Sequence, residues 1–210
     1  MNKTHSLARR LLALPPGKLA ACAAALAVTV VAAGVTTAAG STTPRVTSSF
    51  SFKLVPATGI AACLPKASGH VTITTGSLND TMVVSVSGMP ANAGFDLFVI
   101  QQPGKPFGVS WYQTDLQANS SGTGSATVRG VFDSETFSVS PGGTATFAPT
   151  HQYHLGLWFN DPNVPFNLGC EPGATSPVVT PFNGEQNAGI QALNTSNFPV
   201  AAGPLSHVHR

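Results

Sequence analysis

The sequence predicts an all-β protein, an antiparallel β-sandwich of the immunoglobulin-like or a similar kind. Three observations support this fold class. Short apolar runs alternate with clusters of Gly, Pro, Asn and Ser, as in sandwiches and barrels. Only 9% of the residues are charged, against roughly 25% in ordinary soluble domains, while 42% are hydrophobic. A disordered chain would need low hydrophobicity and high net charge, so this composition indicates a folded domain.

The first 39 residues differ from the rest of the chain. Four of the ten basic residues lie within residues 1–18, and no charge occurs in residues 19–39. This order is typical of a signal peptide, with cleavage expected near Ala39. The alternative is an uncleaved membrane anchor over residues 19–39, because that run is long enough to span a bilayer. We therefore expect a secreted protein, or one anchored by this segment, with a linker over residues 40–50.

Beyond this leader the chain carries six basic and eight acidic residues. The balance provides no basic surface for nucleic acid and no polybasic patch for a membrane. We expect no nucleic-acid partner, and membrane contact only through an uncleaved N-terminal segment.

The expected sandwich domain covers residues 51–200, and its strands follow one another at short intervals. Within residues 81–88, Met82, Val84 and Val86 share one face while the residues between them share the other, which is the period of a half-buried strand. Gly, Pro and Asn between the runs supply the turns. In order, we expect strands over residues 46–55, 70–75, 81–88, 95–102, 108–116, 124–132, 135–140 and 151–160.

The last forty residues are rich in Pro, Gly and Asn. They predict an irregular arm laid over the sandwich. Residues 185–194 could form one short helix, although Gly189 weakens that interpretation. Residues 201–210 are expected to be a flexible tail.

Three cysteines are present, and Cys22 falls within the leader. The remaining two, Cys63 and Cys170, most simply form a disulfide in an exported domain. Free thiols at both positions are the alternative.

Two groups of motifs resemble known exported proteins. The run "VSVSGMPANAGFDLFVI" followed by "TDLQANSSGTGSATV" is similar to a strand–turn–strand pattern of exported bacterial β-sandwiches. The combination of "PFGVSWYQTDL", "HLGLWFNDP" and "TPFNGEQNAGIQALNTSNFP" resembles secreted proteins of actinobacterial type over about residues 70–205. We know of no activity assigned to those proteins, so the resemblance implies fold and location and transfers no site residue.

The most distinctive stretch is "HQYHLGLWFNDP", residues 151–162. On a strand its odd positions face the core, while His154 and Trp158 face the opposite way. We expect these two residues and Trp111 to form an exposed aromatic patch that contacts a ligand. His151 and His154 then diverge, and zinc needs three or four converging ligands, so we expect neither a metal site nor a cofactor.

No catalytic motif stands out, and a GxSxG nucleophile elbow is missing. Asn119 and its glycines favour a hairpin turn over a calcium loop. We therefore expect a non-catalytic exported protein that binds an unknown extracellular ligand or envelope component. One alternative is a small-ligand or metal carrier. The other is a hydrolase using a pair of carboxylates in one cleft, chosen from Asp115, Asp133, Glu135 and Asp161.

Overall fold

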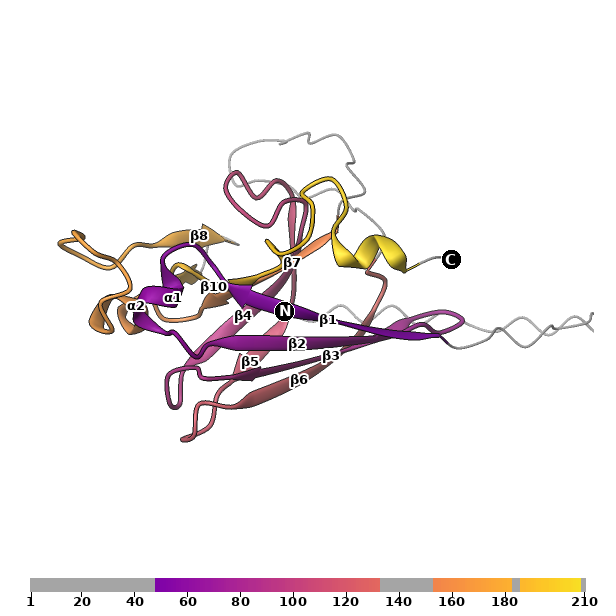
Figure 1. Cartoon of the computed structure of the whole chain (residues 1–210), viewed down its shortest axis with the longest axis horizontal. Coiled ribbons are helices and arrows are strands. Elements are labelled where there is room, and N and C mark those ends of the chain that lie inside the picture. Colours follow the sequence, from indigo (N-terminus) through magenta and orange to yellow (C-terminus); the bar gives the residue numbers. More distant parts are fainter. Residues whose placement is uncertain (1–47, 133–152, 183–185, 209–210) are drawn as a thin grey trace, which may run out of the picture. The chain divides into compact units, whose positions relative to one another are not determined.

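The protein is mostly β and antiparallel, as the sequence predicts (Figure 1). The computed structural model describes residues 48–132, 153–182 and 186–208. The expected leader, the expected strand over 135–140, and His151 lie outside these residues. Eight strands form one sheet in the order β5-β4-β7-β10-β1-β2-β3-β6, and β8 pairs with β9 separately.

The elements of the described residues run in the following order: β1 (Ser49–Pro56), α1 (Ile60–Cys63), β2 (Ser68–Thr74), β3 (Asp80–Ser87), β4 (Gly94–Ile100), β5 (Ser110–Gln117), β6 (Gly124–Gly130), β7 (His154–Phe159), α2 (Asn163–Asn167), β8 (Thr180–Phe182), β9 (Gln186–Ala188), β10 (Gln191–Asn194) and the 3-10 helix η1 (Pro204–His207).

The large sheet nearly closes into a barrel. Its two halves, β6-β3-β2-β1 and β10-β7-β4-β5, are joined by only two register pairs, Val55 with Asn194 and Pro56 with Leu193. The edge strands β5 and β6 are brought together by the short turn between them, which Asn119 stabilises by accepting hydrogen bonds from the backbone N–H groups of Ser121 and Thr123. The expected turn is thus confirmed, but it does not close a β-hairpin, because β5 pairs with β4 and β6 pairs with β3. The all-β antiparallel class is also confirmed, whereas the division into two sandwich layers is not.

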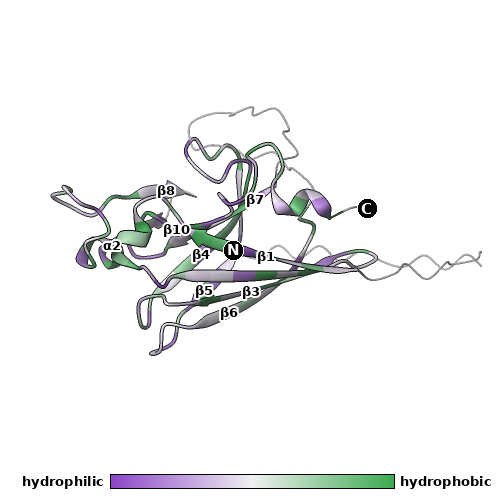
Figure 2. Ribbon diagram, in the orientation of Figure 1, coloured by the Kyte–Doolittle hydropathy of each residue, from purple (hydrophilic) through white to green (hydrophobic). Residues whose placement is uncertain are grey.

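Alternation along the strands sends one set of side chains into a single main core. In β3, Met82 and Val84 are fully buried while Val83 is 38% exposed, which confirms the faces expected from the sequence. The outward positions of β2, β3 and β6 are largely Ser and Thr, so pale segments alternate with green ones along this part of the sheet in Figure 2. The largest side chains of this core are Leu54, Ile60, Ile73, Met82, Phe95, Leu97, Leu116, Phe132, Leu155, Leu157 and Phe159.

The half of the sheet around β4 and β7 is covered on both faces. All six residues of β7 are buried, and so are all residues of β4 after Gly94. A second, smaller cluster lies on the outer face and contains Phe98, Ile100, Trp158 and Ala188, with Phe107 packed against it. Phe107 comes from the loop between β4 and β5, and Ala188 comes from β9. A second layer therefore covers the strand that carries His154 and Trp158.

The C-terminal part of the chain contributes more regular structure than its composition suggests. Residues 185–194 do not form a helix, because β9 pairs with β8 and β10 enters the large sheet between β7 and β1. At the end expected to be a tail, η1 places the side chain of Leu205 in the main core, where it is fully buried.

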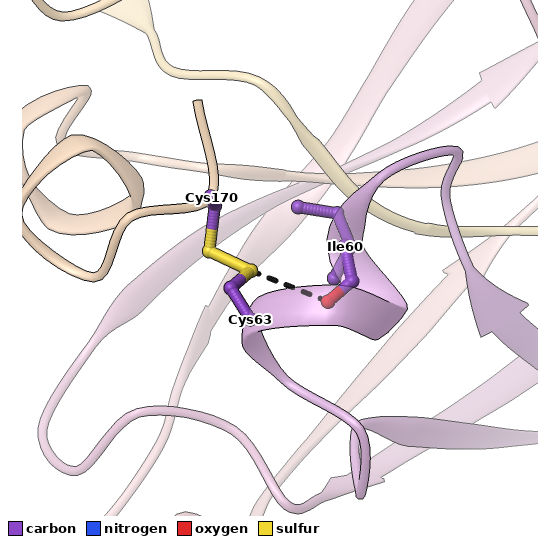
Figure 3. Close-up of a disulfide and its surroundings, with 3 residues drawn as sticks. All are labelled: Ile60, Cys63 and Cys170. Carbon is purple, nitrogen blue, oxygen red and sulfur yellow. Dashed lines mark hydrogen bonds between the residues drawn. A yellow bond between two sulfur atoms is a disulfide. The ribbon is translucent and has the colours of Figure 1, made fainter. Parts of the chain in front are cut away.

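Cys63 and Cys170 form the predicted disulfide, with their Cα atoms 5.1 Å apart (Figure 3). The bond joins the end of α1 to the segment after α2. The dashed contact of 3.2 Å between the Cys63 sulfur and the Ile60 carbonyl oxygen is a close S···O approach, because a disulfide sulfur carries no hydrogen to donate. The bridge fixes the backbone next to Glu171, a residue that lines the hollow described below.

Candidate functional site

The two faces of β7 separate as the sequence predicts, but neither face is open to solvent. Leu155, Leu157 and Phe159 belong to the main core. On the other face His154 is fully buried and Trp158 is 4% exposed. The expectation of an exposed aromatic patch is therefore wrong, because the β4–β5 loop and β9 cover this face.

Trp111 does not join the other two candidate residues either. It stands opposite Val99 in the register of β4 with β5, and it packs against the main core. The reason is an irregularity in β5: Leu97 pairs with Thr114, but Phe98 pairs with Tyr112. Gln113 is the extra residue, and a bulge of this kind reverses the faces of the residues beyond it. If Gln113 paired regularly with Phe98, Trp111 would stand opposite Ile100, on the same face as His154.

His154 is a structural residue in this arrangement. Its Nε2 lies 3.0 Å from the Val200 carbonyl oxygen, and its Nδ1 lies 2.8 Å from the Thr195 hydroxyl. Because a carbonyl only accepts, the neutral ring carries its hydrogen on Nε2, and the Thr195 hydroxyl donates to Nδ1. Burial lowers the pKa of His154. Both ring nitrogens are engaged within the protein, so this residue is not placed to ligate a metal.

Trp158 is held by aromatic neighbours and by a glycine. Its ring meets those of Phe98 and Phe107 nearly at right angles, with centroids 5.4 Å and 4.9 Å apart. Gly156 lies two residues before it on the same face. A Cβ atom at Gly156 would stand 2.4 Å from the indole Cζ3 and 2.6 Å from the Gln191 side-chain nitrogen. Only the bare backbone of glycine allows the indole and the Gln191 amide to meet over this point of the strand.

Trp158 also lines a hollow on the outer face, which we call the Trp158 hollow. It has two compartments that share Phe107, Trp158 and Thr180. The polar compartment has a volume of about 470 Å³, and its walls include Lys105, Glu171, Gln191 and Asn194. The apolar compartment has a volume of about 320 Å³ and is bounded by Phe98, Pro106, Pro181 and Ala188, with Ser110 at its edge.

Three polar atoms in the walls of the polar compartment are buried without a hydrogen-bond partner among the described residues. They are the indole nitrogen of Trp158, one carboxylate oxygen of Glu171 and the amide nitrogen of Gln191. A buried polar group without a partner costs about 1–3 kcal/mol, and native proteins keep few of them. Three around one hollow therefore mark it as a place where a ligand could supply the missing partners.

Two carboxyl groups, one buried and one exposed, lie in the same transverse row of the sheet as Trp158. Asp96, which is 1% exposed, stands opposite Trp158 on one side and Asp115 on the other. The Asn160 amide donates to Asp96 at 2.9 Å, and the Tyr112 hydroxyl donates to Asp115 at 2.7 Å. Burial raises the pKa of Asp96 to about 6, and the neighbouring Asp115 adds to this rise. The fold therefore favours the protonated form of Asp96 more than water does.

Asp96 was not among the carboxylates expected to act, although its sequence carries a signal. It is the one charged residue within an otherwise apolar strand, "FDLFVI". Of the carboxylates that were expected, Asp115 is exposed on β5, and Asp161 accepts two hydrogen bonds from Asn163 at the start of α2. Asp133 and Glu135 lie outside the described residues.

Among the described residues, no group of three or more His, Cys, Asp or Glu side chains could hold a metal ion. Nor does that part of the chain contain a helix with the length and apolar character needed to cross a bilayer. The disulfide is compatible with an oxidising, extracellular location.

Comparison with known proteins assigns no family. The chain matches no family model, and no curated protein matches it significantly. The functional argument therefore rests on the geometry alone.

Proposed function

We propose that the protein is an exported, non-catalytic binding protein whose small ligand occupies the Trp158 hollow. The observation that carries this proposal is the indole nitrogen of Trp158, which is buried in the wall of the hollow and has no partner among the described residues. The apolar compartment beside it offers aromatic and proline surfaces of the kind that small-molecule sites use.

Export is supported by the charge pattern of the first 39 residues and by the disulfide. We infer a secreted protein, with anchoring through residues 19–39 as the alternative. The N-terminal sequence of the protein recovered from the culture medium tests this directly. A start near residue 40 supports secretion, and retention of the whole chain in the membrane fraction supports the anchor.

The hydrolase alternative has less support. Asp96 and Asp115 stand opposite each other in the register of β4 with β5, and Asp96 is buried. Carboxyl groups that act on a glycosidic bond must face a common cleft that admits the substrate. Neither Asp96 nor Asp115 lines the Trp158 hollow. A metal carrier is not supported either, because His154 is occupied by Thr195 and Val200.

Tryptophan fluorescence can test the binding site, because the chain contains only two tryptophans. In a Trp111→Phe variant, Trp158 is the sole tryptophan emitter and lies in the wall of the hollow. We expect the dye anilinonaphthalene sulfonate to brighten and to quench Trp158 in a saturable, one-to-one manner. A Thr180→Phe variant should weaken this response, because residue 180 lines both compartments.

The control is Thr127→Phe, the same substitution at an exposed position of β6. It should leave the titration unchanged. Dye binding that is equal in the Thr180→Phe and Thr127→Phe variants would show that the hollow is not the binding site.

A further inference from the structure

We propose that the ligand of the Trp158 hollow is a small zwitterion with an apolar side group, namely an apolar amino acid or a short peptide of such residues. This inference rests on the proposed function and names the chemistry of the same site. It follows from the charges of the walls, from the three unpartnered atoms and from the apolar compartment.

The walls of the hollow carry one charge of each sign. Among the lining residues that the structure describes, only Glu171 and Lys105 are charged, and both belong to the polar compartment. No ion pair joins them in the part of the chain that the structure describes. A ligand that complements these walls therefore carries both a positive and a negative group.

Glu171 provides the acceptor for the positive group. One of its carboxylate oxygens accepts the backbone N–H of Val178 at 2.8 Å, while the other is buried without a partner among the described residues. The neighbouring Cys170 is held by the disulfide, so the backbone that carries Glu171 is fixed. A ligand ammonium group would complete this carboxylate with a charge-assisted hydrogen bond.

Two donors stand ready for the negative group. The indole nitrogen of Trp158 can only donate. The orientation of the Gln191 amide is set by Asn194, whose side-chain nitrogen donates to the Gln191 oxygen at 2.9 Å and to the Pro103 carbonyl at 3.0 Å. The Gln191 nitrogen is therefore left as a free donor. A ligand carboxylate accepts from both, and the exposed Lys105 adds attraction at the rim.

The unpartnered atoms are buried in residues that line the hollow, so a ligand reaches them when nearby side chains turn. Glu171 and Gln191 are only partly buried and can rotate toward the hollow. This reorientation is a small change of the kind common at binding interfaces.

The apolar compartment accounts for the side group. It has about 320 Å³ of space, and none of its described lining residues is charged. Most of its wall is apolar, from the rings of Phe98, Phe107 and Trp158 with two prolines and Ala188, and the hydroxyl residues in it are Ser110 and Thr180. A benzyl or branched alkyl group would fill this space. A neutral sugar fits less well, because it would leave the Glu171 carboxylate without a cation.

The test is a calorimetric titration of the disulfide-bonded protein with L-phenylalanine and the dipeptide Leu-Phe. Phenethylamine lacks the carboxylate, 3-phenylpropanoate lacks the ammonium, and benzyl alcohol lacks both. We expect sub-millimolar binding of L-phenylalanine or of Leu-Phe, and at least tenfold weaker binding of the three analogues. A preference between the amino acid and the dipeptide identifies the source of the zwitterion.

Variants of Glu171 and Lys105 test which residues contact the two charged groups of the ligand. Glu171→Gln keeps the shape of the side chain and should weaken zwitterion binding at least tenfold, while leaving benzyl alcohol binding unchanged. Lys105→Gln should weaken it a few-fold, because this residue is exposed. Lys66→Gln, at another exposed lysine outside the lining of the hollow, is the matched control and should have no effect.

The outcomes separate the two proposals. If all the aromatic probes bind equally, and only the Thr180→Phe variant weakens them, the hollow is a binding site but the zwitterion proposal is wrong. If none of these probes binds, and the dye does not quench the fluorescence of Trp158, both proposals fail.

Discussion

Replacing Asp96 with Asn should make the protein more stable at neutral pH, although the substitution lies in a buried strand. The fold favours the protonated form of the Asp96 carboxyl, since burial raises its pKa from 3.8 to about 6. Above that pH the carboxyl is charged in the folded protein, and burying this charge is unfavourable, which lowers the free energy of unfolding. Asparagine carries no charge, so the variant does not bury one at this position.

The size of the effect follows from the pKa difference. One pKa unit corresponds to 1.36 kcal/mol, so the rise to about 6 makes the folded protein about 3 kcal/mol less stable at pH 7–8 than in acid. Because the pKa is raised in the folded protein, the stability that Asp96 contributes is fully present below pH 3.8 and is lost as the pH rises through about 6. In the Asp96→Asn variant the new side-chain amide still offers an oxygen to the Asn160 amide, and its nitrogen can donate to Asp115.

Urea unfolding followed by circular dichroism from pH 4 to pH 8 measures this difference. We expect the two proteins to unfold at similar urea concentrations at the acid end, with the variant more stable by about 2–3 kcal/mol at pH 8. Asp115→Asn is the control. It removes only the neighbouring charge, so it should recover a smaller part of this stability, because burial is the main cause of the raised pKa. A stability difference that is the same at pH 4 and pH 8 would refute the reasoning.

Three further perturbations follow from the packing. Reducing the Cys63–Cys170 bond frees a loop with a sequence separation of 107 and should lower the free energy of unfolding by about 4–5 kcal/mol in the chain-entropy account, as measured by urea unfolding with and without reductant. His154→Ala should cost about 2–4 kcal/mol, because it leaves a cavity and unpaired groups at Val200 and Thr195. Because burial lowers the pKa of His154, this residue contributes stability above pH 6.5 that is lost as the pH falls. In an Asp96→Asn background, this loss of stability in acid should therefore occur when His154 is present and disappear when it is replaced by Ala. Gly156→Ala should cost about 1–3 kcal/mol and shift the Trp158 emission, because the new methyl group would overlap the indole; unchanged emission would contradict the proposed seat of the ring.

The strands were predictable where a single face is buried. Met82, Val84 and Val86 alternate with less buried residues, so the pattern reveals both the strand and its core face. The disulfide was predictable from counting the cysteines outside the leader. β9 and β10 were not predictable, because Gln, Asn and Gly189 give them little strand preference, and β10 is a strand chiefly because it pairs with β7 and β1.

The candidate site was only partly predictable, for two physical reasons. The sequence places His154 and Trp158 on the outer face of β7, but it does not show that Phe107 and Ala188, far away along the chain, cover that face. As a result Trp158 forms part of a hollow instead of an exposed patch. Glu171 and Gln191 join the site only through the disulfide and the pairing of β10, which are long-range contacts.

The second reason is the extra residue in β5, and it leads to a further prediction. Deleting Gln113 would remove the bulge but leave Thr114 opposite Leu97, Tyr112 opposite Phe98 and Trp111 opposite Val99. Trp111 should therefore keep its place against the main core. In a Trp158→Phe background, acrylamide quenching of Trp111 should be the same with and without Gln113. A clear change in quenching would show that Gln113 is more than the extra residue of a bulge and that it helps to hold Trp111 on its face of the sheet.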